Sequence, residues 1–600
     1  MTAPSPQQAA GALASFTISA NGTPIDSSWQ VVSIDVWTGV NKLPKARLVL
    51  SDGSASSEDF PISDSATLIP GVKLTIALGY DGQETTVFAG VIYRQGLDVT
   101  QNVASRLVVE ATDEAMKMTL ARHNALYENV TDSDLIGKLI GNAGLGKSVI
   151  ATATKQDVIV QYYSTDWDLM VIRAQLNGMV VTVDAGKVTV APPDTRRSPV
   201  LTVTFGDSML DFQAEMDAAT QYSDSAIQSF AWDPANQTLA KSGKATASVS
   251  EPGNISSAEL AKVFGITQFP QQTGGSLDST ELTSWSSADL LKSKLSKIRG
   301  TTTFQGSALA KTGCMITLAG VGGRFNGNYY VSAVHHSLCD GFWRTSTALG
   351  LSPDWFTTVA PNIPAPSASG QLPPVTNLQT GLVKKIDQDP DGEFRVYVQL
   401  PLLQAGGSLG VWARLGSFYA YSGIGAEFYP EIEEEVVVAF MNDDPRFPVI
   451  VGSLYSKKNP PPVTPDAKNN QKCIVTRSKL RIDFFEDKKA VEVSTPGGQK
   501  VRLDDDAKTV TVKDRNGNTV TMAPGGVTVD SAAKLTLSAK GDISITAQGN
   551  LSMKANADVT VNGRQIKQSA QGAFSAHGNS GASLTASGEV TIKGLLVNIN

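Results

Sequence analysis

The motif in this sequence that most suggests chemistry is a phosphate-loop pattern at residues 141–148. The stretch GNAGLGKS fits G-x-x-x-x-G-K-S without a mismatch. Such a loop binds phosphate only where a strand precedes it and a helix follows it, so that backbone N–H groups face the phosphates. Here a predicted helix with Leu135, Leu139 and Ile140 on its apolar face precedes the loop, and a Thr-rich stretch follows. We interpret the motif as a helix that stops at Gly141 or Gly144.

A second candidate is the cluster of His335, His336, Cys339 and Asp340, whose residue types could bind a metal ion. Adjacent residues on a strand point to opposite faces of the sheet, so the two histidines cannot both reach one ion without a bulge. The chain has four histidines in all, too few for much His-based catalysis. The sequence predicts no metal site and no cofactor.

Paired carboxylates are the third possibility, because glycoside hydrolases use two of them. Glu431 and Glu435 lie in a dense acidic run. Four residues apart on a predicted strand, they would be about 13 Å apart, beyond the separation of up to about 9.5 Å that such enzymes use. This spacing argues against a glycosidase pair of carboxylates.

The stretch that must organise the C-terminal part is a run of five eight-residue repeats that begins at Gly525. Each repeat reads small, polar, apolar, polar, apolar, followed by three mostly small or polar residues. This alternation predicts one short strand per repeat with a regular bend between strands. The apolar pairs are Val527 and Val529, Leu535 and Leu537, Ile543 and Ile545, Leu551 and Met553, and Val559 and Val561.

Repeats of this kind bury only one narrow apolar face and leave strand edges unpaired. A one-chain parallel solenoid and three chains wound around a common axis both fit the periodicity. The three-chain arrangement solves both problems, because the apolar pairs fill a prism interior and each strand pairs with other chains. We predict an intertwined homotrimer with the ten apolar residues as its core.

Composition limits the remaining classes of protein. The chain has 600 residues, with 41% hydrophobic residues, 18% charged residues, 53 glycines and a net charge of −7. This length indicates several domains, the glycine content favours turn-rich β-structure, and the mild charge indicates no affinity for nucleic acid. Three widely spaced cysteines fit a reducing compartment. The N-terminus has no signal-peptide pattern, and no run of about 18 apolar residues occurs.

The rest of the chain consists mostly of short alternating segments, so we predict a mainly β protein. Residues 14–112 and about 200–353 read as β-barrels or sandwiches with inserted α/β segments. These include helices after Thr131, where Asp132 or Asp134 could be the cap, and at Ser287–Ile298. The predicted domains are a β-rich region at 1–358, a linker at 359–376, an OB-fold barrel at 377–456, a strap at 457–479 and a trimeric β-helix at 480–600.

The barrel region resembles a known protein family. Residues 428–440, FYPEIEEEVVVAF, with 442–455, NDDPRFPVIVGSLY, are similar to the barrel signature of the VgrG spike proteins of type VI secretion and related contractile injection systems. These proteins resemble a phage hub fused to a phage spike. The usual signature has Gly-Asp where this chain has Glu433 and Glu434, which puts the turn conformation at residue 433 in question.

The resemblance implies a homotrimeric central spike and baseplate hub. Its N-terminal domains would bind a hexameric inner tube and baseplate proteins. Its blunt end, Leu596, Val597, Asn598, Ile599 and Asn600, would bind a small PAAR-type tip protein, with effector cargo possible. Such a protein is made in the bacterial cytoplasm, ejected on sheath contraction and driven mechanically through the target membrane. Phage relatives of the family can carry a lysozyme domain between barrel and spike, but only the short stretch from Tyr455 to Leu480 separates them here, so we expect a protein that is not itself an enzyme. A phage tail spike or adhesin and an envelope-polysaccharide-degrading tail enzyme are the alternatives.

Overall fold

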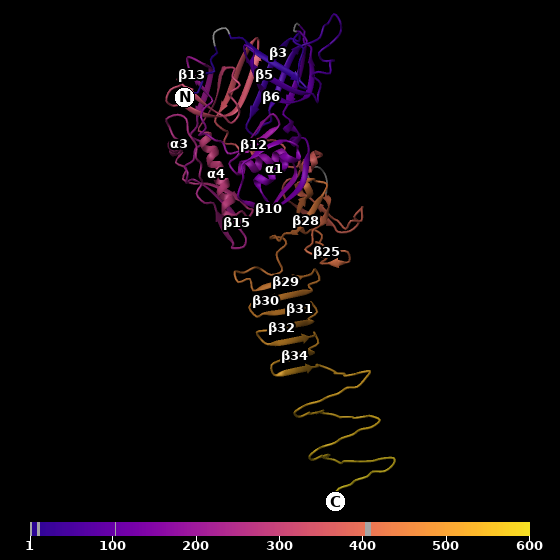
Figure 1. The fold of residues 1–600 in the computed structure, drawn as a ribbon. Helices are drawn as coiled ribbons and strands as arrows, with labels where there is room; N and C mark the ends of the chain where they lie inside the picture. Colours follow the sequence, from indigo (N-terminus) through magenta and orange to yellow (C-terminus); the bar gives the residue numbers. More distant parts are fainter. Residues whose placement is uncertain (1–2, 9–11, 102–103, 403–409, 600) are drawn as a thin grey trace. The chain divides into compact units, whose positions relative to one another are not determined.

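The computed structural model describes residues 3–8, 12–101, 104–402 and 410–599. The chain divides into two compact units, Met1–Leu454 and Tyr455–Asn600. The first unit and the part of the second unit up to Asp530 are built mainly of strands, as the sequence predicts (Figure 1). Among the described helices, none is long and apolar enough to cross a membrane.

The first unit contains a thirteen-stranded sheet in which strands far apart in the sequence are neighbours. Its main path runs β14-β18-β21-β20-β3-β4-β7-β6-β5-β1-β2, and β13 and β19 pair beside it. The strands are β1 (Ala14–Ala20), β2 (Thr23–Pro24), β3 (Val31–Gly39), β4 (Lys45–Ser51), β5 (Lys73–Tyr80), β6 (Gln83–Asp98), β7 (Arg106–Thr112), β13 (Leu201–Thr204), β14 (Met209–Met216), β18 (Ile298–Gln305), β19 (Met315–Ala319), β20 (Gly327–Cys339) and β21 (Phe342–Leu349).

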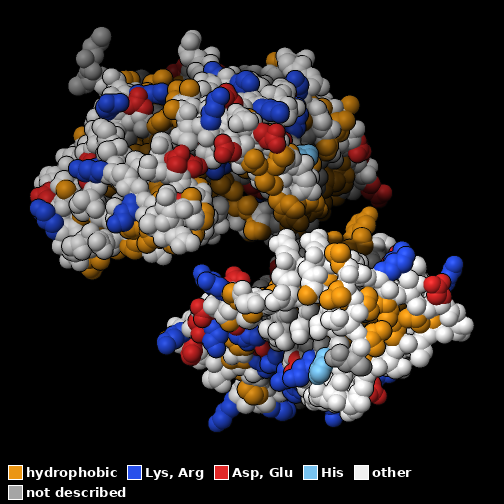
Figure 2. Space-filling model, turned by 90° about the horizontal axis from the view of Figure 1, so that it is seen from below, with side chains coloured by type: hydrophobic (Ala, Val, Ile, Leu, Met, Phe, Trp, Pro, Cys, Tyr) orange, Lys and Arg blue, Asp and Glu red, His pale blue; other side chains and the backbone are white. Residues whose placement is uncertain are grey.

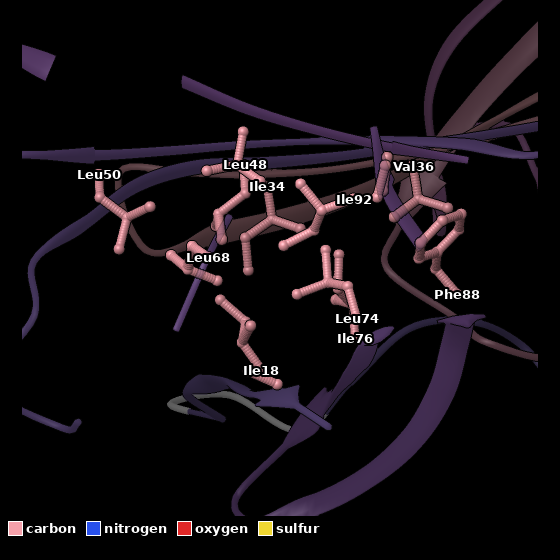
Figure 3. Close-up of a cluster of buried hydrophobic side chains, with 14 of the residues drawn as sticks. Ile18, Ile34, Val36, Leu48, Leu50, Leu68, Leu74, Ile76, Phe88 and Ile92 are labelled. Atoms are coloured by element: carbon pink, nitrogen blue, oxygen red, sulfur yellow. The ribbon is translucent and has the colours of Figure 1, made fainter. Parts of the chain in front are cut away.

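Two hydrophobic cores lie along this sheet. One is built from the first seven strands around Ile34, Leu48 and Ile76, which are fully buried (Figure 3). The other surrounds Phe304 and Tyr329. The antiparallel pairing of β20 with β3 joins the two halves, from Ala333 opposite Gly39 to Cys339 opposite Ser33. The two β-rich stretches seen in the sequence therefore correspond to two cores of a single sheet.

An α/β segment is inserted between β7 and β13. It contains a 3-10 helix, η1 (Glu114–Thr119), strands β8 (Arg122–Thr131), β9 (Gly146–Val149), β10 (Lys155–Thr165), β11 (Val180–Asp184) and β12 (Lys187–Ala191), and helices α1 (Asp132–Asn142) and α2 (Asp166–Leu176). The expectation that Asp132 or Asp134 caps α1 is wrong. The Thr131 hydroxyl accepts the N–H of Asp134, and Asp132 instead pairs with Arg173 at 2.5 Å.

A second insertion comprises β15 (Ile227–Asp233), β16 (Thr238–Lys241), β17 (Phe269–Thr273), α3 (Ser257–Phe264) and α4 (Ser279–Leu295). Helix α4 starts eight residues before the predicted start at Ser287. Its first turns are polar and show no apolar period, but a capping box between Asp278 and Glu281 fixes the start. The short helix α3 begins with the same kind of capping box, formed by Ser256 and Glu259.

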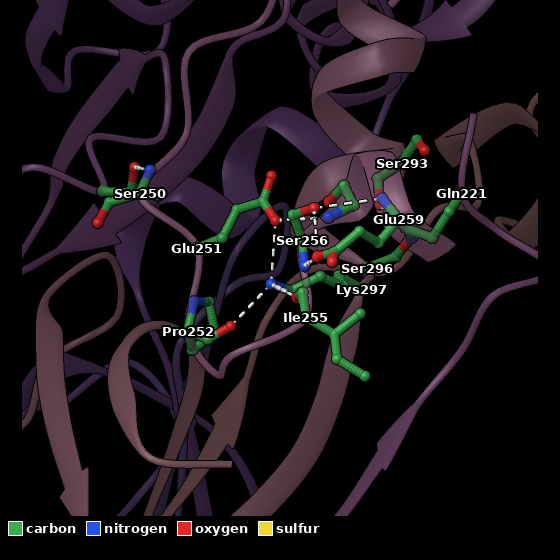
Figure 4. Close-up of polar contacts among 12 residues, drawn as sticks. Gln221, Ser250, Glu251, Pro252, Ile255, Ser256, Glu259, Ser293, Ser296 and Lys297 are labelled. Atoms are coloured by element: carbon green, nitrogen blue, oxygen red, sulfur yellow. Dashed lines mark hydrogen bonds and ion pairs between the residues drawn. The ribbon is translucent and has the colours of Figure 1, made fainter. Parts of the chain in front are cut away.

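A buried lysine connects the second insertion to the sheet. Lys297 is 1% exposed, and its ammonium donates to Glu251 Oε2 at 3.0 Å and to the carbonyls of Pro252 and Ile255 at 2.7 and 2.9 Å (Figure 4). A buried charge is tolerated only when it is paired and hydrogen-bonded, and here all three ammonium protons have acceptors. This contact fixes the loop before α3.

The Pro-rich segment predicted as a linker is held along much of its length. After α5 (Phe356–Val359), the guanidinium of Arg122 donates to the carbonyls of Asn362, Ile363 and Pro364. Farther on, Ser367 in η2 (Ser367–Gly370) donates to the Asp443 carboxylate at 2.8 Å. These bonds connect the segment to the α/β insertion on one side and to the following barrel on the other.

Five strands then close into the predicted barrel, in the order β22-β23-β24-β28-β27. They bury Val383, Val396, Val398, Val436 and Val438 completely. A short ribbon and a 3-10 helix, η4 (Met441–Asp443), accompany them. The strands are β22 (Gln379–Lys385), β23 (Val396–Gln399), β24 (Gly410–Leu415), β27 (Glu435–Phe440) and β28 (Pro448–Ser453), and the ribbon is β25 (Ala420–Tyr421) with β26 (Ile424–Gly425).

The turn at residue 433 keeps its left-handed conformation although glycine is absent. Glu433 has φ +68°, its N–H donates to the Val383 carbonyl, and its carboxylate lies 2.6 Å from Lys384 Nζ. The neighbouring Glu434 carboxylate accepts the N–H of Glu431 at 2.8 Å. The question that the Gly-Asp replacement raised is thus answered, because Glu433 adopts the conformation that glycine prefers.

The second unit begins with a seven-stranded antiparallel meander in which each strand pairs with the next. Its strands are β29 (Gln471–Val475), β30 (Arg481–Phe485), β31 (Ala490–Ser494), β32 (Lys500–Asp504), β33 (Thr509–Lys513), β34 (Thr519–Ala523) and β35 (Gly526–Asp530). From Ser531 to Ile599 the described chain contains no assigned strand or helix.

We predict that Glu433→Gly stabilises the barrel by about 0.5–1 kcal/mol, because it removes a left-handed non-glycine residue and loses only a half-exposed ion pair. Glu434→Gly is the matched control and should destabilise the barrel by about 1 kcal/mol, since it removes the acceptor for Glu431. Hydrogen exchange of Glu435–Phe440 in the full chain measures both effects. Faster exchange in Glu433→Gly than in the unmodified protein would contradict this account of the turn.

Candidate functional site

The ten residues predicted as a trimer core lie at the surface of the single chain. Val527 and Val529 belong to β35, and the other eight lie beyond it, where no strand is assigned. All ten are between 53% and 72% exposed. A one-chain solenoid would pair successive repeats and cover these side chains, which the described residues do not do. In the described residues beyond β35 no strand pairing is assigned, so the structure does not show the one-chain solenoid there.

The same two apolar rows continue through the seven-stranded sheet. The strand register aligns them without a shift, and together they form what we call the apolar face. One row is Ile474, Ile482, Val493, Val501, Val512, Val520 and Val529, and the other is Phe484, Val491, Leu503, Val510, Met522 and Val527. These side chains are half-buried or exposed, and Figure 2 shows hydrophobic side chains open at the molecular surface.

The opposite side of the sheet, the charged face, bears a network of ion pairs. Arg481 Nε lies 2.5 Å from the Asp483 carboxylate. Glu492 pairs with Lys500 at 2.8 Å and with Arg502 at 3.1 Å, and Arg502 also pairs with Asp504 at 2.7 Å. The three carboxylates are buried beneath the longer side chains. The sheet therefore has one face whose charged groups pair with one another and one apolar face that no part of the described second unit covers.

These ion pairs shift the acidity of the carboxyl groups. Hydrogen bonds from Arg481 hold the pKa of Asp483 below its usual range. Burial acts to raise the pKa of Glu492, but the hydrogen bonds from Lys500 and Arg502 outweigh it, so that pKa is also lowered. Both groups thus stabilise the folded sheet in their ionised form.

One asparagine fixes the point at which the chain leaves the sheet. The side-chain oxygen of Asn518 accepts the N–H of Ala532 at 3.0 Å and the hydroxyl of Ser531 at 3.1 Å. Asp514 holds Asn518 in place by accepting its backbone N–H at 2.8 Å and its side-chain N–H at 2.7 Å. The segment that follows β35 is therefore anchored to the turn between β33 and β34.

The predicted tip-binding end is also open. Leu596, Val597, Asn598 and Ile599 are exposed, and Asn600 lies outside the described residues. The structure brings no second segment of the chain onto these four residues in the described part of the molecule. They remain a prediction.

The motifs that suggested chemistry have structural roles. The phosphate-loop pattern begins in the last turn of α1 and ends within β9. Lys147 Nζ donates to the Gly137 carbonyl at 2.8 Å, which fits the interpretation as a helix end. The adjacent histidines have separate partners. His335 Nε2 lies 2.9 Å from Asp35, while buried His336 shares a hydrogen bond with Thr345, and burial lowers the pKa of His336 to about 3.

The assumption made about the two glutamates is wrong. Glu435 begins β27, but Glu431 precedes the turn, so the two do not lie on one strand. The separation of about 13 Å that four strand residues would give does not apply to them. The Glu431 backbone N–H instead closes the turn by donating to Glu434.

Comparison with known families assigns both parts of the first unit. Residues 379–455, which include all five barrel strands, match the type VI secretion system/phage-baseplate injector OB domain. This match confirms the resemblance to VgrG-type spike proteins. Residues 379–455 are thus similar to a domain that type VI secretion systems and phage-baseplate injectors share.

Residues 10–340, more than half of the chain, match the Alg8 N-terminal domain. The chain belongs to the Alg8 N-terminal domain family.

Solved structures show distant similarity. A 43 kDa tail protein of a Shewanella oneidensis prophage is 11% identical, with a TM-score of 0.43 over 57% of this chain and 98% of its own. A type VI secretion component of E. coli is 14% identical, with a TM-score of 0.35 over 73% and 99%. VgrG in a Francisella PdpA–VgrG complex is 9% identical, with a TM-score of 0.35 over 87% and 80%. No curated protein sequence matches the chain.

We predict that the seven-stranded sheet loses stability in acid through its charged face. The pKa of Asp483 is lower in the folded than in the unfolded chain, so its contribution is complete above the unfolded value of about 4 and is lost as the pH falls through the folded value. Asp483→Asn should lower the melting temperature at pH 7 and flatten its dependence on pH below 4. Exposed Asp530→Asn is the control. Circular dichroism melts at pH 7, 4 and 3 measure both, and an equal acid dependence in Asp483→Asn and the unmodified protein would contradict the assignment.

Proposed function

We propose that this protein is the homotrimeric central spike and baseplate hub of a contractile injection system. The observation that supports this most strongly is the uncovered apolar face, which continues as paired apolar residues in every repeat up to Val561. Large exposed apolar surfaces of soluble proteins mark sites of association. Because the same rows recur in each copy, copies of this chain are the natural cover.

Three chains account for both halves of the second unit. In the seven-stranded part, three sheets can place their apolar faces around one axis and keep their charged faces outside. Beyond Ser531 each chain supplies one short strand per repeat, whose N–H and C=O groups require partners from other chains. An interwound prism satisfies these groups, and opening one strand in it breaks bonds to two chains at once. Such a body resists force along its axis.

The proposed spike is long enough to cross a bilayer. Residues 480–600 hold roughly 15 repeat lengths, which at about 4.7 Å each span some 70 Å, more than the 40–45 Å of a membrane with its headgroups. The outward positions are mostly Ser, Thr, Lys and Asn, so sheath contraction rather than spontaneous insertion would drive the crossing. We propose that the N-terminal unit binds the hexameric inner tube and baseplate proteins.

We propose that the C-terminal end is the binding site for the tip protein. Leu596, Val597 and Ile599 from three copies would form a blunt apolar platform of the kind that a small PAAR-type protein could cover, with effector cargo attached to tip or spike. We also propose that the chain is not itself an enzyme, because Lys147 of the phosphate-loop pattern and the two adjacent histidines are each bound to other groups of the folded chain. Ejection from the producing cell on firing follows from the proposed role.

We predict that Ile543→Asp with Ile545→Asp prevents assembly of the spike. The two side chains would lie in the prism interior, where three copies would bury six carboxylates without partners. Light scattering of the full chain should give three times 63.3 kDa for the unmodified protein and a lower mass for the variant. The first unit should stay folded in both, as measured by its tryptophan fluorescence.

The control changes the alternate positions of the same repeat. Ser544→Asp with Thr546→Asp adds the same charge on the outward side and should leave the trimer mass and its resistance to detergent unchanged. Loss of the trimer in this variant, or a stable trimer in the isoleucine variant, would refute the proposed interior. A monomer for the unmodified chain would refute the homotrimer.

A further inference from the structure

The barrel has a projecting hydrophobic arm, residues 416–429. It joins β24 to the acidic turn before β27 and contains the short β25–β26 ribbon (Figure 1). Its side chains are among the most exposed large apolar groups of the chain. Phe418 is 88% exposed, Tyr421 77% and Phe428 61%, with Tyr419 and Ile424 at 56%.

The arm is ordered by few bonds of its own. The ribbon pairs only two residues on each side, and a hairpin this short is not stable alone in water. The Ser417 hydroxyl donates to the carbonyls of Tyr419 and Ala426, and the Tyr429 hydroxyl, at the base, donates to the Phe394 carbonyl at 3.0 Å. Nothing in the described part of the first unit covers the aromatic side chains.

Strand register places the arm at one particular end of the barrel. β24 and β28 are parallel, and β27 runs antiparallel to β28, so the end of β24, the start of β27 and the end of β28 lie together. The loop between β22 and β23 opens at the same end, because both strands pair antiparallel there. Exposed Phe394 and Ile432 therefore share this end with the arm.

The chain leaves the barrel at this end, which limits the distance between copies. Residues 454–470 connect β28 to β29 and reach at most roughly 60 Å when fully extended. In the proposed trimer, three barrels are tethered to one spike through their arm-bearing ends. Tethering of this kind gives effective concentrations in the millimolar range, so even a weak contact between barrels would form.

The chemistry of the arm indicates a protein partner of similar character. Residues 416–426 contain no charged side chain in a chain that is 18% charged, and exposed Tyr and Phe are the residue types enriched in protein interfaces. A membrane surface fits less well, because Glu427 and the run Glu431–Glu435 at the base of the arm would be repelled by anionic headgroups.

We propose that the arm of each copy packs on the arm-bearing end of the neighbouring copy's barrel, against the surface that includes Phe394 and Ile432. Three such contacts form a closed ring, because each barrel gives one arm and receives another. The ring would lock the three barrels into a collar independently of the spike. This inference rests on the proposed homotrimer.

The decisive experiment is photo-crosslinking of the full chain with benzoylphenylalanine in place of Phe418. A mixture of ¹⁴N- and ¹⁵N-labelled chains, refolded together, separates contacts within a chain from contacts between chains in the mass spectrum. We expect crosslinks between differently labelled chains, to residues 377–402 and 427–454. The matched control has the same probe in place of Phe342, an exposed residue of β21 in the N-terminal sheet, and should give no such product.

Each other outcome refutes a specific statement. A trimer whose Phe418 probe reacts only with its own chain, or with the strap at 455–470, overturns the arm contact while leaving the spike. Crosslinking to lipid in the presence of phosphatidylglycerol vesicles, but not between chains, replaces the collar with a membrane contact. A monomer by light scattering refutes the homotrimer, and the arm contact with it.

A variant gives an independent readout. Phe418→Ser with Tyr421→Ser should leave the trimer mass unchanged and speed hydrogen exchange severalfold at residues 386–395 and 431–434, since the neighbouring arm would no longer cover them. Leu239→Ser with Phe342→Ser, which changes two exposed apolar residues of the hub, is the control. Unchanged exchange in the arm variant would contradict the proposed contact.

Discussion

The need of every strand for a partner governs the second unit of this protein. Through β35 the backbone groups pair with the next strand of the same chain, and one side of the sheet is closed by ion pairs such as Arg481 with Asp483. Only the apolar face lacks a cover. Past Ser531 no strand pairing is assigned within the described chain. In the proposed trimer, dependence on other copies therefore grows along the chain, from a missing cover for side chains to a missing partner for every strand.

The first unit is the opposite case, because its polar groups are largely satisfied within the chain. Buried Lys297 has three acceptors, buried Asp132 has Arg173, and the Pro-rich segment is tied down by Arg122. Such a body can fold before it meets another copy. In the proposed assembly, folded first units bring three unfinished spikes together, which lowers the entropy cost of pairing strands from different chains.

Local patterns predicted much of this fold, since strand alternation is a property of neighbouring residues. The β-rich stretch at residues 14–112, the barrel at 377–456 and the phase of the repeats could be read in this way. The start of α4 could not, because its first turns lack an apolar period and only the Asp278 cap defines them. The pairing of β3 with β20 joins residues some 300 positions apart, for which no local signal exists. The arm at 416–429 was missed because its aromatic residues resemble an ordinary strand, and only the folded barrel shows that they are uncovered.

The order of the two parts of the proposed spike has a physical reason. The repeats from Gly525 onward are nearly alike, so three chains could pair them equally well after a slip of one whole repeat, with every apolar residue still inside. The antiparallel sheet before them removes this ambiguity. Each of its strands pairs in a fixed register with the next strand of the same chain, and its ion pairs connect particular strands. Asn518, just before β34, accepts a hydrogen bond from Ala532 and so fixes where the chain continues after the sheet. Three such sheets, once packed by their apolar faces, would present the first repeat of every chain at the same level. The irregular part of the spike thus provides the alignment that the regular part needs but cannot specify by itself.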